Sequence, residues 1–230
     1  MLKFPQLTVT VLLNEDLSFK RSCEELSKFI NSIMFLDEAL KVRHSMRGYK
    51  HYTFSGLYPT EKSKIYKKGN IYIFTIRSAD FYFSEVIKEN LKMVNSNIFH
   101  IISSELKERK QKFISELSSI TPVIITVDNN THWTQEYGLD LLKQKLHNNL
   151  KFKFESFYRK GLEDTECFFS GLEVMNSLPI LIPYKKGYFL GNKFKIQVKD
   201  DLISQETATM SLSSGLGEKN SIGMGFCHSS

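Results

Sequence analysis

The 230-residue sequence has few cysteines and no long apolar run. Its three cysteines are odd in number, far apart and outside any C-x-x-C pair, which argues against both a disulfide framework and a zinc site. The apolar run at residues 7–13 is too short to span a membrane, and Glu15 and Asp16 follow it, so it predicts neither a span nor a signal peptide. We therefore expect a cytoplasmic protein with reduced thiols.

Glycine is also scarce, with 12 residues, yet four of them lie in the stretch GLGEKNSIGMGF at 215–226. A dinucleotide-binding fingerprint would need a third glycine at Asn220, and a P-loop would need a glycine where Glu218 precedes Lys219. Both motifs are excluded. What remains is a glycine-rich loop whose backbone N–H groups and lysine suit a phosphate, or a tight turn before a last strand.

The excess of positive over negative charge lies entirely in the first half of the chain. Residues 1–120 carry 19 Lys and Arg against 13 Asp and Glu, whereas residues 121–230 carry 12 of each sign. Residues 41–68 hold a local charge of +7, which favours a polyanion such as nucleic acid over a plain solvated loop. Within this segment we expect Arg43 and Arg47 to bind RNA.

The first half predicts a strand, a helix, two strands, a helix and a strand. The pattern Ser22-x-x-Glu25 predicts a helix N-terminus as a capping box, and a basic loop follows the helix as far as Tyr52. The runs LTVTVLL, HYTFSGLY, NIYIFTIR and NIFHIISSEL predict strands, and residues 84–94 predict the second helix. This β-α-β-β-α-β order is that of a ferredoxin-like module.

The second half predicts a looser version of the same order. The segments are a strand at 120–128, a helix at 139–150, strands at 168–174, 178–184 and 188–198, a helix near 201–210 and a terminal strand at 222–228. We therefore expect an α+β fold of tandem ferredoxin-like (RRM-like) domains, residues 1–120 and 121–230, with a C-terminal glycine-rich loop.

Two such modules, a basic first half and a late loop of the form G-x-G-x-x-x-x-x-G-x-G together resemble the sixth Cas family of CRISPR-associated repeat-processing endoribonucleases. The resemblance covers the whole chain in architecture and is specific in the loop and at residues 44–57. It implies that the loop packs between the two domains and bears on the RNA backbone. The loop residues that it assigns to RNA binding are Gly215, Gly217, Lys219, Asn220, Ser221, Gly223 and Gly225.

The family places a catalytic histidine in the loop after the first helix and a lysine a few residues later, before an aromatic-Thr-aromatic-Ser strand. His44, Lys50 and YTFS at 52–55 match this pattern, so the resemblance implies that His44 and Lys50 are catalytic. Some relatives add a tyrosine on the first helix, but the nearest position here is Asn31, and no tyrosine is assigned. His51 is the nearest rival to His44, and we expect it to be a surface residue or to contact RNA.

The resemblance implies cleavage of precursor CRISPR RNA within repeats by the RNA's own 2′-hydroxyl, which leaves a 2′,3′-cyclic phosphate and a 5′-hydroxyl. An imidazole with an ordinary pKa of about 6.5 suits the proton transfer, and a lysine suits the charge that develops at phosphorus. No carboxylate cluster has metal-ligand spacing, so we expect no metal site and no cofactor.

Other readings stay open from sequence. The alternative function is a non-catalytic CRISPR RNA-binding subunit of the same superfamily, which keeps the fold and the loop but only holds RNA. Association with a CRISPR interference complex and formation of a homodimer are also open, and no membrane association is expected.

Overall fold

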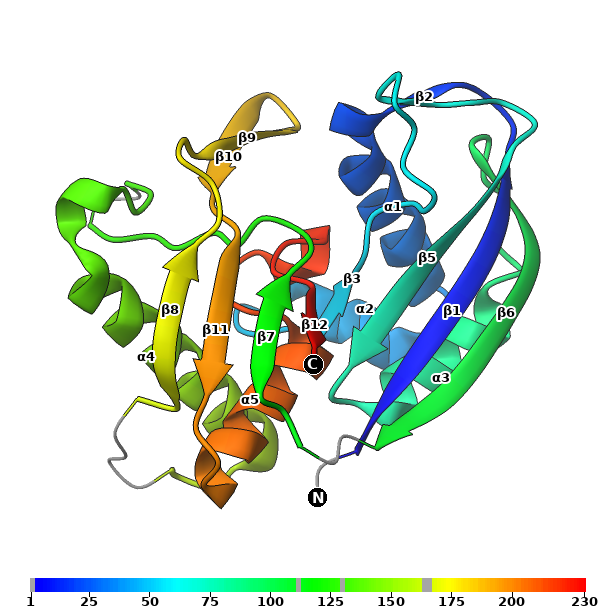
Figure 1. The fold of residues 1–230 in the computed structure, drawn as a ribbon. Coiled ribbons are helices and arrows are strands. Elements are labelled where there is room, and N and C mark those ends of the chain that lie inside the picture. The colour runs from blue at the N-terminus through cyan, green and yellow to red at the C-terminus, as the bar shows by residue number, and fades with distance from the viewer. Residues whose placement is uncertain (1–2, 111–112, 129–130, 163–166) are drawn as a thin grey trace.

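The computed structural model describes residues 3–110, 113–128, 131–162 and 167–230. It contains two four-stranded antiparallel sheets that lie side by side, with helices packed behind each of them in the view of Figure 1. None of the helices in the described ranges is long and apolar enough to cross a membrane.

The first unit is built on strands with one buried face. Its elements are β1 (Lys3–Leu13), β2 (Leu17–Ser18), α1 (Phe19–Met34), α2 (Glu38–Ser45), β3 (Tyr52–Phe54), β4 (Ile65–Tyr66), β5 (Ile71–Ser78), α3 (Phe81–Asn90) and β6 (Phe99–Lys110). The sheet order is β3-β5-β1-β6, and β2 pairs only with β4. Alternate residues of β1, from Leu7 to Leu13, are buried in one core with the apolar stripe of α1, as a period of two requires.

The predicted capping box is wrong, because α1 begins at Phe19 and Ser22 lies inside the helix. The Ser22 hydroxyl donates to the carbonyl of Phe19 at 2.8 Å, and Glu25 accepts from Arg21 at 3.1 Å. A serine inside a helix often bonds to a carbonyl of the preceding turn, so the spacing Ser-x-x-Glu alone did not mark the helix start.

The basic loop predicted after α1 is in part a helix. Asp37 is the N-cap of α2, and its carboxylate accepts a hydrogen bond from the backbone N–H of Leu40 at 2.9 Å. Leu40 is the buried residue of this short helix, so the sequence carries little apolar periodicity there. His44 consequently lies in the last turn of a helix, not in a loop.

The second unit repeats the arrangement of the first. Its elements are β7 (Glu116–Ser119), the 3-10 turn η1 (Gln135–Tyr137), α4 (Leu139–Tyr158), β8 (Phe169–Val174), β11 (Phe194–Val198), α5 (Leu202–Ser214), the 3-10 turn η2 (Asn220–Ile222) and β12 (Cys227–Ser229). The sheet order β12-β7-β11-β8 places the first strand between the fourth and the third, as β1 lies between β6 and β5. The expectation of tandem ferredoxin-like domains is confirmed. A hairpin of β9 (Ile180–Tyr184) and β10 (Gly187–Gly191) is inserted between β8 and β11.

The start and the end of the second unit differ from the prediction. The strand predicted at 120–128 makes isolated bridges only, and β7 precedes it at Glu116–Ser119. The first sheet therefore ends with β6 and the second begins before residue 120. Residues 123–125 are apolar because the glycine-rich loop covers them. This apolar run led the sequence analysis to predict a strand there. The helix near 201–210 is confirmed and runs to Ser214, whereas the terminal strand covers only Cys227–Ser229.

The C-terminal segment joins the two units, and Figure 1 shows it in red between the sheets. Thr53 of β3 donates to the carbonyl of Met224 at 3.3 Å, and the Tyr52 hydroxyl donates to that of Ser221 at 3.4 Å. The buried guanidinium of Arg77 on β5 donates to the carbonyl of Cys227 at 2.6 Å. The expected packing of the loop between the two domains is confirmed.

Candidate RNA-processing site

The glycine loop, residues 215–225, folds back on itself through glycines with positive φ. Gly217 has φ 67°, and a Cβ there would lie 2.6 Å from Val123 Cγ1. Gly223 has φ 88°, and a Cβ there would lie 2.7 Å from the ring of Phe54. Both glycines are buried, whereas Lys219 is exposed. The glycines therefore set the shape of the loop, and the lysine is the part of it that faces outward.

Lys153 of α4 holds the loop from inside, and sequence analysis did not single it out. Its side chain is buried, and Nζ donates to the carbonyls of Gly215 at 2.7 Å and Gly217 at 2.6 Å and to Oδ1 of Asn220 at 2.8 Å. Burial lowers the pKa of Lys153 to about 7, against the smaller opposite effects of Cys227 and Glu218. Three oxygens around one nitrogen match the three protons of an ammonium group.

One signal in the sequence marks this lysine. Leu142, Leu146 and Leu150 form the buried stripe of α4, and Lys153 follows at the next position of that stripe. A lysine on an apolar helix face is rarely buried unless it is paired, so its position indicates a buried polar partner. The partner is a loop more than sixty residues away in sequence, so the spacing of residues along α4 could not predict it.

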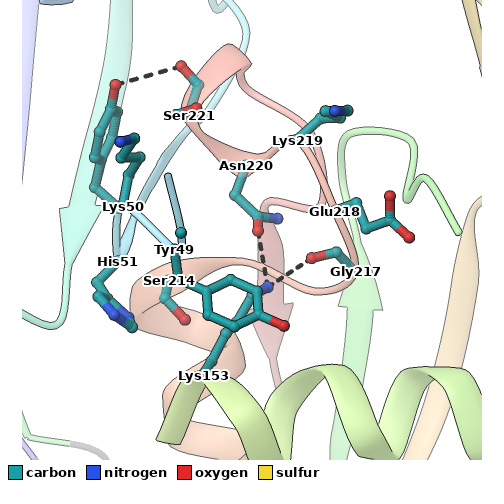
Figure 2. Close-up of a pocket in the computed structure, with 12 residues that line it drawn as sticks. Tyr49, Lys50, His51, Lys153, Ser214, Gly217, Glu218, Lys219, Asn220 and Ser221 are labelled. Atoms are coloured by element: carbon teal, nitrogen blue, oxygen red, sulfur yellow. Dashed lines mark hydrogen bonds between the residues drawn. The ribbon is translucent and has the colours of Figure 1, made fainter. Parts of the chain in front are cut away.

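A pocket of about 290 Å³ lies next to Lys153 and the loop residues to which it is hydrogen-bonded. We call it the loop pocket; Figure 2 shows it between the segment 48–52 and the glycine loop, with Lys153 beneath. The lining is Gly48, Tyr49, Lys50, His51, Tyr52, Lys153, Ser214, Gly217, Glu218, Lys219, Asn220 and Ser221. The pocket thus brings together residues of both domains, with three lysines and one carboxylate.

The charge of Lys50 acts on the imidazole of His44, but of these two residues only Lys50 lines the loop pocket. Lys50 Nζ donates to the carbonyl of Arg43 at 2.7 Å and to that of Met46, so it caps the C-terminus of α2. The His44 ring packs edge-on against Phe35 at a centroid distance of 5.1 Å. Burial, followed by the charges of Lys50 and Lys185, lowers the pKa of His44. A neutral imidazole therefore stands beside a cation at neutral pH.

His51 lines the loop pocket and is half-buried, so it is not a fully exposed surface residue, and its contact with RNA stays a prediction. Its backbone has a positive φ of 56°, its Nε2 lies 3.2 Å from the hydroxyl of Ser156, and its ring packs on Phe157 at 5.2 Å. Burial, with smaller effects of Arg43 and Lys153, lowers the pKa of His51 to about 4. So low a pKa makes this imidazole a weak base, which separates it from His44.

Part of the basic charge of residues 41–68 is neutralised by carboxylates from elsewhere in the first unit. Arg43 forms an ion pair with Asp80, and Lys67 forms one with Asp16 at 2.9 Å. Arg43 also donates to the carbonyl of Lys50 at 2.7 Å, so its guanidinium positions the segment that lines the loop pocket. Arg47 is exposed. Of the two arginines predicted to bind RNA, Arg47 is the one whose side chain faces solvent.

The family model for the C-terminal part of the CRISPR-associated protein Cas6 matches residues 103–229, which is more than half of the chain. The chain belongs to the Cas6 family. The matched span contains the whole second ferredoxin-like unit, Lys153 and the glycine loop. The suspected resemblance is confirmed.

Individual Cas6 relatives match over nearly the whole length. The protein named CRISPR-associated endoribonuclease Cas6 2 of Methanocaldococcus jannaschii is 26% identical over 96% of this chain and 98% of its own. A solved structure of a Cas6-related protein from Pyrococcus furiosus superposes with a TM-score of 0.75 at 19% identity, covering 99% of this chain and 98% of that one. A structure described as an RAMP protein binding different RNA substrates has a TM-score of 0.75 at 17% identity, covering 98% and 99%. These structural likenesses show the shared fold.

Within this Cas6 fold, the residues predicted for the site fall into two groups. Those that line the loop pocket are Lys50, Gly217, Lys219, Asn220 and Ser221, and those outside its lining are Arg43, His44, Arg47, Gly215, Gly223 and Gly225. The amide of Asn220 is turned inward, since its Nδ2 donates to the carbonyls of Leu216 and Met224 at 3.1 and 2.9 Å. The contacts of both groups of residues with RNA stay predictions. Across the described ranges, no three His, Cys, Asp or Glu side chains are grouped so that they could hold a metal ion.

We expect Gly217→Val to weaken RNA binding more than Lys219→Ala. Valine requires a rare backbone conformation and clashes with Val123, so it deforms the loop, whereas alanine removes one exposed cation. For Lys219→Ala the log–log dependence of affinity on salt should become shallower by roughly 0.7–0.9. Filter binding at several salt concentrations measures both the RNA affinity of each variant and its dependence on salt. Lys88→Ala, an exposed lysine of α3, is the control; unchanged affinity in both loop variants would leave the loop as a structural turn.

Proposed function

We propose that the protein is an endoribonuclease that cuts precursor CRISPR RNA within its repeats. The observation that carries the proposal is that the charge of Lys50, which lines the loop pocket, acts on the imidazole of His44 in a chain of the Cas6 family. The relative from Methanocaldococcus jannaschii, which matches over 96% of this chain, is named an endoribonuclease. Exposed Lys219 and Arg47 supply positive charge for the RNA backbone.

In the proposed reaction the 2′-hydroxyl attacks the adjacent phosphorus and the bond to the 5′-oxygen breaks. The lowered pKa of His44 keeps its imidazole neutral near pH 7, so it accepts the proton of the 2′-hydroxyl. Lys50 stabilises the negative charge that grows on the phosphorane-like transition state. The departing 5′-oxygen takes up a proton from solvent, and the products are a 2′,3′-cyclic phosphate and a 5′-hydroxyl.

One observation favours a second candidate, a CRISPR RNA-binding subunit without catalysis. Asn31 stands on α1 where some relatives have a tyrosine, and its Oδ1 is buried without a hydrogen-bond partner in the described part of the chain. His44 also lies outside the lining of the loop pocket. A subunit of this kind would bind repeat RNA with the same salt dependence and leave it intact.

Cleavage of repeat RNA is expected to continue in excess EDTA. The proposed chemistry uses an imidazole and an ammonium group, so chelation removes nothing that it needs. A single 2′-deoxy substitution at the cut should stop the reaction, because the attacking oxygen is gone. Gel analysis with and without phosphatase identifies the cyclic end. A magnesium-dependent nuclease serves as the chelation control, and activity restored only by Mg²⁺ or Mn²⁺ would contradict the mechanism.

A further inference from the structure

A second pocket adjoins the loop pocket along α4. We call it the amide pocket; its volume is about 380 Å³, within the range of about 300–1,000 Å³ typical of ligand sites. Tyr49 and Glu218 line both pockets, and Lys153 of the loop pocket directly follows Phe152 of the amide pocket on α4. A single extended ligand can therefore occupy both.

Side-chain amides dominate the α4 wall of this pocket. Gln144 and Asn148, four residues apart, lie on one helix face, and Asn149 lies beside them. Each amide presents a donor next to an acceptor, which is also the pattern along the edge of a nucleobase. Asn149 Oδ1 is buried and has no hydrogen-bond partner within the described ranges. An unpaired buried acceptor costs about 1–3 kcal/mol. If the Asn149 amide turns toward the pocket, an N–H group of a bound base satisfies this acceptor.

Two aromatic rings stand at the pocket with much of their surface exposed. Phe152 is 52% exposed and Tyr49 is 38% exposed. The buried face of α4 is formed by Leu142, Leu146 and Leu150, so Phe152 is not part of the core. Exposed aromatic rings beside amide groups are the usual means by which proteins stack and read single-stranded RNA bases.

The lining of the amide pocket holds one cation, Lys145, and one carboxylate, Glu218, so it has no net positive charge to bind a phosphate. Glu218 lies between the two pockets, and its carboxylate accepts from the N–H of Thr126 at 2.9 Å and from the Thr126 hydroxyl at 2.8 Å. These bonds fix the negative charge at this wall, where a phosphate would be repelled. The same carboxylate is one of the causes that raise the pKa of Tyr49, after burial. A neutral, planar group with donors fits this wall.

We propose that the amide pocket binds one unstacked nucleobase of the RNA strand whose backbone lies at the loop pocket. Phe152 stacks on the base, and the amides of Asn148 and Asn149 hydrogen-bond to its edge. This inference rests on the proposed function and adds to it a site that reads sequence next to the cut. Because α4 lines both pockets, the bound base also sets which phosphate reaches Lys50.

The test is a double-mutant cycle between protein and RNA. Synthetic RNAs of the host's CRISPR repeat carry one abasic nucleotide each, moved through the positions around the cut, and bind wild type and Phe152→Ala. Stacking of one base is worth about 1–3 kcal/mol, so Phe152→Ala should weaken binding of intact RNA by roughly 5- to 150-fold. At one abasic position the two proteins should bind equally, since the stacking partner is already absent. Asn149→Asp, which replaces the amide donor by an acceptor, should change the base preferred at that same position.

The control is Phe19→Ala, because Phe19 has the same exposed fraction of 52% but lies at the start of α1 against Tyr66. It should leave RNA affinity unchanged. Additive effects of Phe152→Ala and abasic substitution at every position, in RNA that wild type still cuts, would overturn this inference and leave the proposed function standing. If wild type neither binds nor cuts the repeat RNA, both are overturned.

Discussion

His44→Ala is expected to cut repeat RNA about 10²–10⁴-fold more slowly than wild type, the usual loss when a general base is removed. RNA affinity should hardly change, because a neutral imidazole adds little to a surface that carries Arg47, Lys50 and Lys219. Single-turnover cleavage under saturating protein measures the rate, and filter binding measures affinity. Lys50→Ala should instead reduce both, since its cation acts on the phosphate in the ground state and in the transition state.

The matched control is His51→Ala, which removes the histidine that lines the loop pocket. We expect a smaller loss of rate, because the pKa of His51, lowered to about 4, makes it a weak base. For wild type, the rate should fall as the pH drops through the lowered pKa of His44, since protonation removes the base form. His44→Ala should lose this acid limb. The reverse pattern, with His51→Ala inactive and His44→Ala as fast as wild type, would move the catalytic role to His51.

Lys153→Met should lower the free energy of unfolding by about 3–5 kcal/mol, because each buried acceptor left without its donor costs about 1–3 kcal/mol. Methionine fills the same volume but leaves the carbonyls of Gly215 and Gly217 and the Asn220 oxygen without their donor. For a chain of this size the melting temperature should fall by roughly 10 °C. Cleavage at a temperature where the variant is folded should also fall, because the loop is no longer held against α4.

Lys143→Met provides the comparison on the same helix. Its side chain is 42% exposed and pairs with Asp140 only at 4.0 Å, so the free energy of unfolding should change by less than about 0.5 kcal/mol. Thermal melts of both variants measure the change in melting temperature, and urea unfolding measures the change in the free energy of unfolding. If Lys153→Met were as stable and as active as Lys143→Met, the buried ammonium group would have no part in shaping the loop.

Most of the fold was predictable because strands and helices with one buried face leave a period in the sequence. The alternation in β1 and the leucine stripe of α4 are direct examples. β7 was missed because Glu116–Ser119 carries little apolar signal and owes its place to pairing with β11 and β12. Residues 123–125 were wrongly predicted as a strand, because their apolar side chains lie beneath the glycine loop and do not belong to a sheet face.

The candidate site was predictable only where a motif is local in sequence. The glycine loop and the segment from His44 to Phe54 are such motifs, and the structure brings the loop and part of that segment into one pocket. Lys153 joins the same pocket through contacts over more than sixty residues, and the burial of His51 depends on Phe157 of α4. These features follow from how the domains pack, which spacing along one segment does not encode.

The hydrogen bond from Tyr52 to Ser221 spans 169 residues, so one wall of the loop pocket is translated long before the other. At translation speeds of about 5–20 residues per second the delay is on the order of ten to thirty seconds. Once β6 has been translated as far as Lys110, the first ferredoxin-like unit has all its strands and exposes the face of β3 that the glycine loop later covers. A nascent chain therefore has no assembled pocket, and any RNA that it meets before release encounters half a site.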